Sequence, residues 1–134
     1  MLRSKLATLR EYRQSLAEWL AESLQEFVGD PKRTAAARYA YQTIMECARD
    51  INDELLARQA GVSARSHEDA FQRMAAQGML PLELAERFRE HCRLRNRIVH
   101  QYNEVRDDQF HAAGKRLVAD AEEYAQHIAR VIGL

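Results

Sequence analysis

The sequence has few of the residues that build turns, cross-links or membrane spans. Five Gly and two Pro in 134 residues argue against a turn-rich β protein. Cys47 and Cys92 are too few for a disulfide framework or a metal cluster, so we expect no metal and no other cofactor. No apolar run approaches the roughly 20 residues of a membrane span, and the N-terminus lacks the apolar centre of a signal peptide. These absences favour a soluble, cytoplasmic protein with a single domain over residues 1–134.

The sequence also lacks net charge, because 20 acidic residues balance 20 basic ones. A whole-molecule attraction to nucleic acid is therefore absent. The basic residues are uneven, however, since 17 are Arg and three are Lys. Five Arg lie between Ala85 and His100, where only two Glu oppose them. This local excess fits either a solvated helix face crossed by salt bridges or an anion-binding surface.

Apolar residues recur at helical spacing along the chain and predict an all-α protein with four long helices and a short one. Gly29 should end the first helix, and Asp30 with Pro31 supplies an N-cap and a first helical position for the second. Short connections favour an antiparallel bundle. The expected helices span residues 2–28, 31 to about 58, 66–77 and 81–102, with a last one after a break at 103–108.

The stretch from Arg95 to Tyr102 concentrates residues that handle phosphate. Arg95 could clamp a phosphate through its planar fork, and His100 could carry a proton to or from a ribose hydroxyl or a leaving oxygen. Asn96 could hydrogen-bond His100 one turn on and fix its tautomer. If the helix persists, Tyr102 shares the edge of Arg95 and could position a phosphate or stack on a base. RNA is the favoured substrate because its 2′-hydroxyl is a built-in nucleophile that requires no metal.

One histidine supplies only one proton carrier, whereas general acid and general base catalysis at one phosphodiester usually require two. A symmetric homodimer would bring two copies of the stretch together and supply both. Arg93, Arg97 and His91 are candidate RNA contacts on the same helix, and His91 is expected at the surface. The alternative is an Arg-rich helix end with a capping histidine and no catalytic role.

Paired carboxylates could offer a second kind of chemistry. Glu46 and Asp50 lie one turn apart in the helix expected from residue 31. Such a pair can do acid–base work or hold a metal. No histidine stands at metal-ligand spacing beside them, which makes this site the less favoured one.

The residues from Arg95 to Tyr102 resemble the Arg-x4-His-x-Tyr motif of HepT-like HEPN-domain ribonucleases, the toxins of MNT–HEPN toxin–antitoxin pairs. The resemblance covers nearly the whole chain. Other segments that resemble the family are Asp69-Ala70-Phe71 and Gly78-Met79-Leu80 before the motif, and Arg38-Tyr39, Gln42, Glu46 and Asp50-Ile51 in the second long helix.

The resemblance implies a homodimer whose two motifs face a shared cleft and cut RNA, such as tRNA or mRNA, without a metal. It carries over Arg95 and His100 as catalytic residues and Asn96 as their support. It also implies a nucleotidyltransferase antitoxin that transfers AMP to Tyr102, which would place phosphate and bulk beside Arg95. The alternative is a non-catalytic HEPN module that binds a nucleotide or docks the nucleotidyltransferase. A pure docking module has no need of both Arg95 and His100, which favours the enzyme.

Overall fold

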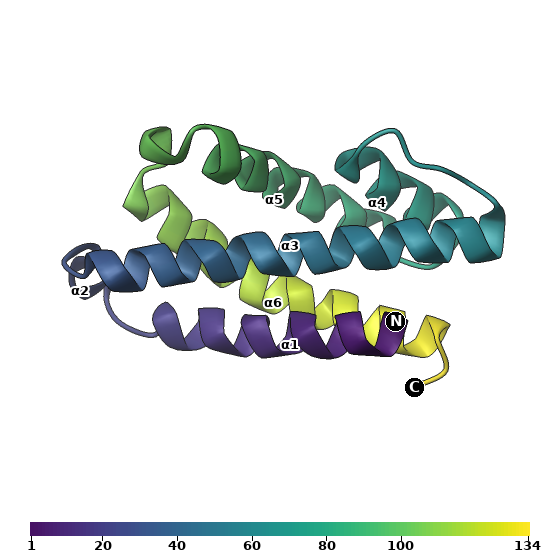
Figure 1. Ribbon diagram of the computed structural model, residues 1–134, viewed down its shortest axis with the longest axis horizontal. Helices are drawn as coiled ribbons and strands as arrows, with labels where there is room; N and C mark the ends of the chain where they lie inside the picture. The colour runs from purple at the N-terminus through teal and green to yellow at the C-terminus, as the bar shows by residue number, and fades with distance from the viewer.

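The computed structural model describes residues 1–134 and is entirely helical. The expected bundle of four long helices is confirmed, and Figure 1 shows α3 running through the middle with α1 on one side and α4 and α5 on the other. None of the helices is both long enough and apolar enough to cross a membrane. The elements are α1 (Leu2–Trp19), α2 (Leu24–Val28), α3 (Pro31–Ala60), α4 (His67–Ala76), α5 (Leu82–His100), the 3₁₀ helix η1 (Tyr102–Glu104) and α6 (Asp107–Val131).

Helix α3, with 30 residues the longest element, begins at Pro31 as predicted and continues to Ala60, slightly beyond the end expected at about residue 58. The side chain of Asp30 accepts a hydrogen bond from the backbone N–H of Arg33 at 3.2 Å, and Pro31 takes the first helical position. Gly61 ends the helix in the left-handed region at φ 62°, which glycine adopts without steric cost. The result is a straight scaffold that reaches from η1 at one end of the molecule to α4 at the other (Figure 1).

The single helix expected over residues 2–28 is wrong, because the chain turns between α1 and α2. Leu20 is buried at the end of α1 against Gly114 of α6, where an added Cβ would lie 2.6 Å from Leu20 Cδ1. The hydroxyl of Ser23 then accepts from the N–H of Glu26 and caps α2. Ser followed three residues later by Glu is a helix-start signature. The continuous apolar stripe concealed that signature in the sequence.

The core is continuous through the bundle and fixes the position of α5. Phe88 of α5 stacks on Phe71 of α4 at 4.6 Å between ring centroids and packs against Tyr124 of α6 at 5.6 Å. Cys47 and Cys92 are free thiols buried in this core, as expected for Cys47. Burial raises the pKa of Cys92 to about 12, so its thiol stays protonated and inert.

Candidate active site

Arg95 lies near the end of α5 and turns its side chain toward α3. Its Nη2 lies 3.2 Å from Oε1 of Glu46, and its Nη1 donates to Oδ1 of Asn96 at 3.3 Å. Glu46 Oε1 also accepts a hydrogen bond from Gln42 at 3.0 Å. The Arg95 side chain is 19% exposed. The guanidinium is therefore held in a fixed orientation with one edge still open to solvent, as a phosphate-binding arginine requires.

The two carboxylates considered as a pair have different partners. Glu46 contacts Arg95, whereas Asp50 pairs with Lys5 of α1 at 2.8 Å. No three His, Cys, Asp or Glu side chains of the chain lie where they could hold a metal ion together. Glu46 thus belongs to the arginine site, a role that its spacing to Asp50 did not indicate.

His100 is the last residue of α5 and is exposed. The hydrogen bond expected between Asn96 and His100 does not form, and the Asn96 side-chain carbonyl accepts from Arg95. Asn96 therefore supports the arginine, and the imidazole of His100 remains free to contact a substrate.

Tyr102 does not share the helical edge of Arg95, so that expectation is wrong. Helix α5 ends at His100, and Tyr102 begins η1 after a break at Gln101. The Tyr102 side chain is 46% exposed, and the guanidinium of Arg38 lies over its ring at 4.5 Å from the centroid. The tyrosine is therefore held beside α3 by a cation–π contact rather than along α5.

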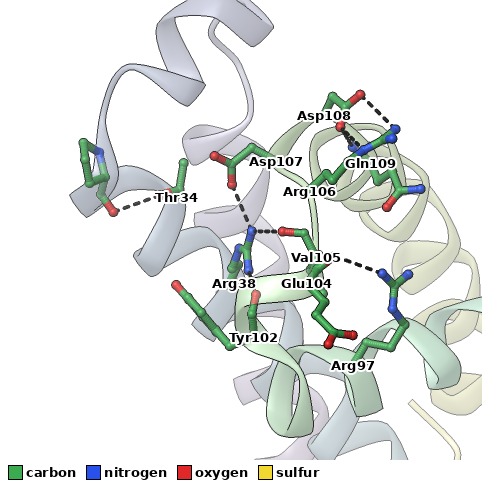
Figure 2. A network of polar contacts seen from close by, with 11 residues as sticks. Thr34, Arg38, Arg97, Tyr102, Glu104, Val105, Arg106, Asp107, Asp108 and Gln109 are labelled. Atoms are coloured by element: carbon green, nitrogen blue, oxygen red, sulfur yellow. Dashed lines mark hydrogen bonds and ion pairs between the residues drawn. The ribbon is translucent and has the colours of Figure 1, made fainter.

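Arg38 clamps the whole segment that follows the motif, as Figure 2 shows. Its Nη1 donates to the carbonyl of Tyr102 at 2.8 Å, and its Nη2 donates to the carbonyl of Val105 at 2.7 Å and to Asp107 Oδ1 at 2.9 Å. Arg38 is only 5% exposed. In the sequence, Arg38 stands out only within the Arg38-Tyr39 segment that resembles the family, and no partner is expected for it. Its position next to Ala37, on the apolar side of α3, is the signal that could have marked it as a buried charge in need of partners.

The two further arginines proposed as RNA contacts lie on the surface of α5 and differ in their partners. Arg93 forms ion pairs with Glu68 at 3.1 Å and Glu90 at 3.3 Å, as the salt-bridge alternative expects. Arg97 contacts only the main-chain carbonyl of Glu104, at 3.3 Å. Arg97 therefore keeps its charge uncompensated.

His91 is not the surface residue expected, since it is only 3% exposed. Its Nε2 lies 2.8 Å from Asp120 of α6, and its Nδ1 lies 2.6 Å from the hydroxyl of Tyr41 of α3. A carboxylate only accepts, so Nε2 carries a proton and donates it to Asp120, while Nδ1 and the Tyr41 hydroxyl are joined by the second hydrogen bond. Burial alone would raise the pKa of Asp120, but the hydrogen bond and Coulombic interaction with His91, followed by those with Arg87, lower it. His91 thus ties three helices together and is a poor candidate for contact with RNA.

An all-α bundle that presents an arginine, a free histidine and a half-exposed tyrosine around the end of one helix has the architecture of a HEPN domain. Residues 8–128 match the family described as Ribonuclease HepT-like, and the chain belongs to this family.

Known relatives agree with this assignment. The chain is 25% identical over 109 residues to a tRNA nuclease HepT of Aphanizomenon flos-aquae, an alignment that covers 81% of this chain and 74% of that protein. Its fold is similar to that of a tri-AMPylated Shewanella oneidensis HEPN toxin solved in complex with an MNT antitoxin, with a TM-score of 0.88, 20% identity and 96% of each chain covered. A toxin–antitoxin solved with AMP-PNP gives a TM-score of 0.85 at 20% identity, over 95% of this chain and 96% of that one. At 20% sequence identity, these structural similarities establish the shared fold and nothing further.

Proposed function

We propose that this chain is the toxin of a type VII-like toxin–antitoxin pair and that it acts in the cytoplasm as a metal-independent endoribonuclease. The observation that carries the proposal is that Glu46 and Asn96 orient the guanidinium of Arg95, while the imidazole of His100, at the end of the same helix, is exposed and unpaired. The names of the relatives support it, since one is a tRNA nuclease and another is a toxin assembled with an MNT antitoxin. The substrate is therefore RNA, with tRNA the first candidate.

In the proposed reaction, Arg95 binds the scissile phosphate and stabilises the negative charge that develops as the 2′-oxygen attacks phosphorus. His100 takes the proton of the 2′-hydroxyl. The bond between phosphorus and the 5′-oxygen then breaks, and a second proton carrier protonates that oxygen. The products are a 2′,3′-cyclic phosphate and a 5′-hydroxyl. Asn96 assists by holding Arg95 through the hydrogen bond described above.

The second proton carrier is proposed to be His100 of a second copy in a homodimer. Within one chain His91 cannot serve, because it is buried between Tyr41 and Asp120. The surface around the motif also carries exposed apolar side chains suited to a protein contact, namely Val99 and Tyr102. A two-fold axis beside α5 would place both copies of Arg95 and His100 in one cleft.

Tyr102 is the proposed site of AMP transfer by a nucleotidyltransferase antitoxin. Its ring is half-exposed and held in place by Arg38. A partner can therefore reach the phenol, and an AMP attached to it would remain at the surface. An added AMP would bring negative phosphate and a bulky base close to the motif and would compete with RNA through charge and volume. The AMPylated toxin among the structural neighbours supports this assignment.

RNA cleavage in the presence of EDTA tests the proposal. The purified protein should cut tRNA and leave 2′,3′-cyclic phosphate ends, and His100→Ala should abolish cutting while its circular dichroism spectrum remains that of the wild type. His127 lies near the C-terminal end of α6, so His127→Ala is the matched control and should cut normally. Undiminished cleavage by His100→Ala would contradict the mechanism. Nucleotide binding without any cleavage by the wild type would support the non-catalytic HEPN module instead.

A further inference from the structure

A groove of about 330 Å³ opens between α5 and α6, away from the Arg95 site. Residues of α5 advance by 100° each, so Arg97 points about 200° away from Arg95 around the helix axis. Arg95 faces α3, whereas Arg97 and Leu94 line the groove toward α6. Its apolar lining consists of Leu94 of α5 and two alanines of α6, Ala112 and Ala113. The proposed chemistry uses none of this surface.

Three arginines and Glu90 line the groove, and Glu90 pairs with Arg93, which leaves Arg97 and Arg116 without a carboxylate partner. Arg116 of α6 lines it without an ion pair, because Asp120 one turn further on is taken by Arg87 and His91. Arg97 has only the carbonyl of Glu104 as a partner. A guanidinium without a carboxylate keeps its donors available for a planar, bidentate contact with phosphate.

One edge of α5 connects this groove to the motif. Arg93, Arg97 and His100 follow one another at spacings of four and three residues, so each lies about one turn beyond the last on neighbouring positions of the helix surface. Arg93 is partly neutralised by its two glutamates, so Arg97 is the free cation nearest to His100 on this edge. A strand cut at His100 can therefore continue past Arg97 into the groove and reach Arg116.

We propose that the groove between α5 and α6 binds backbone phosphates of single-stranded RNA next to the cleavage site, with Arg97 and Arg116 as the phosphate ligands. Gln109, which lines the same groove, supplies a further hydrogen-bonding group for the ribose or base. This proposal rests on the ribonuclease function proposed above and extends the substrate contact to α6, which carries no residue of the motif.

Binding of an uncleavable 2′-O-methyl RNA, followed by fluorescence anisotropy at several salt concentrations, tests the groove. Each lost phosphate contact should lower the slope of log affinity against log salt by about 0.7, which corresponds to about fivefold weaker binding at 0.1 M salt. Arg97→Ala and Arg116→Ala should each show this change, and the double variant should show both. Arg130→Ala removes an exposed arginine from the last turn of α6, outside the groove, and should bind as the wild type does.

Two outcomes would overturn the proposal. The double variant could bind RNA with the affinity and salt slope of the wild type, or free AMP at millimolar concentration could displace RNA from the wild type but not from the double variant, which would mark a mononucleotide pocket. The ribonuclease function fails separately. If the wild type binds RNA in an Arg116-dependent way but never cuts it, the proposed RNA contact in the groove is supported and the proposed ribonuclease activity is contradicted. If the wild type cuts RNA and the variants bind normally, the activity is supported and the groove contact is contradicted.

Discussion

Glu46 Oε1 lies 3.2 Å from Nη2 of Arg95, so the arginine proposed to bind the scissile phosphate already has a carboxylate partner. The contact joins α3 to α5 and is only partly shielded, since 45% of the Glu46 side chain is exposed. Glu46 therefore has two opposite effects. It orients the guanidinium, and its charge competes with an incoming phosphate.

Glu46→Gln should separate these two effects. The amide oxygen can still accept from Arg95, but the negative charge is gone, and a pair this exposed contributes only about 0.5–1 kcal/mol. Uncleavable RNA should therefore bind about two- to fivefold tighter than to the wild type. Glu86→Gln, which removes an unpaired and exposed carboxylate near the start of α5, controls for the change in net charge. Equal tightening in both variants would show that the contact with Arg95 is irrelevant.

Arg38→Lys should loosen the segment that carries Tyr102. A lysine cannot span two carbonyls and Asp107 at once, and it stacks less well on the Tyr102 ring. We expect the free energy of unfolding in urea to fall by about 2–3 kcal/mol, and the amides of residues 102–107 to exchange hydrogen faster. Arg106→Lys changes a neighbouring arginine that is 67% exposed and should stay within about 0.5 kcal/mol. Unchanged stability of Arg38→Lys would mean that the clamp contributes little.

Tyr41→Phe should lower the free energy of unfolding, because it breaks the buried hydrogen-bonded chain from Tyr41 of α3 through His91 to Asp120 of α6. It leaves Nδ1 of His91 without a partner in a buried position, which typically costs about 1–3 kcal/mol. Chemical denaturation should show this loss, whereas Tyr39→Phe, at an exposed tyrosine on the same helix, should be neutral to within about 0.5 kcal/mol. A neutral Tyr41→Phe variant would argue that water replaces the hydroxyl.

His67 should make stability depend on pH on the acidic side of neutrality. Burial lowers its pKa from 6.5 to about 4, helped by the charges of Arg49 and Arg95, and its Nε2 has no hydrogen-bond partner. Because the folded pKa lies below the unfolded one, the unfolded chain takes up the proton first. Stability should fall by on the order of 2–3 kcal/mol as pH drops from 6.5 to 4.

His67→Phe removes this titration and keeps a ring against Phe71, whose centroid lies 5.2 Å from that of His67. Urea unfolding between pH 6.5 and pH 4 should therefore show a shallower loss of stability in the variant than in the wild type. At pH 7 the variant should be at least as stable, since an unpaired buried nitrogen is gone. Parallel curves for the two proteins would rule out His67 as the source.

The elements predicted well from the sequence are those that local chemistry encodes. Asp30 and Ser66 each cap a helix with the side chain, as their positions suggested. Arg95 and His100 were expected near one another simply because they belong to one helix. Where the backbone leaves that helix, at Gln101, the helical geometry no longer applied, and Tyr102 was misplaced.

By itself, the sequence determined the helical class, most of the helix limits and the residues of the motif, because helix periodicity and capping depend on neighbours a few positions apart. Only the tertiary structure decided the partners of those residues. Glu46 meets Arg95 across 49 positions, and Arg38 meets Tyr102 across 64. The burial of His91 between Tyr41 and Asp120 is of the same kind. Such contacts arise from how whole helices pack against one another. The spacing of residues within one helix does not determine which face of a neighbouring helix those residues will contact.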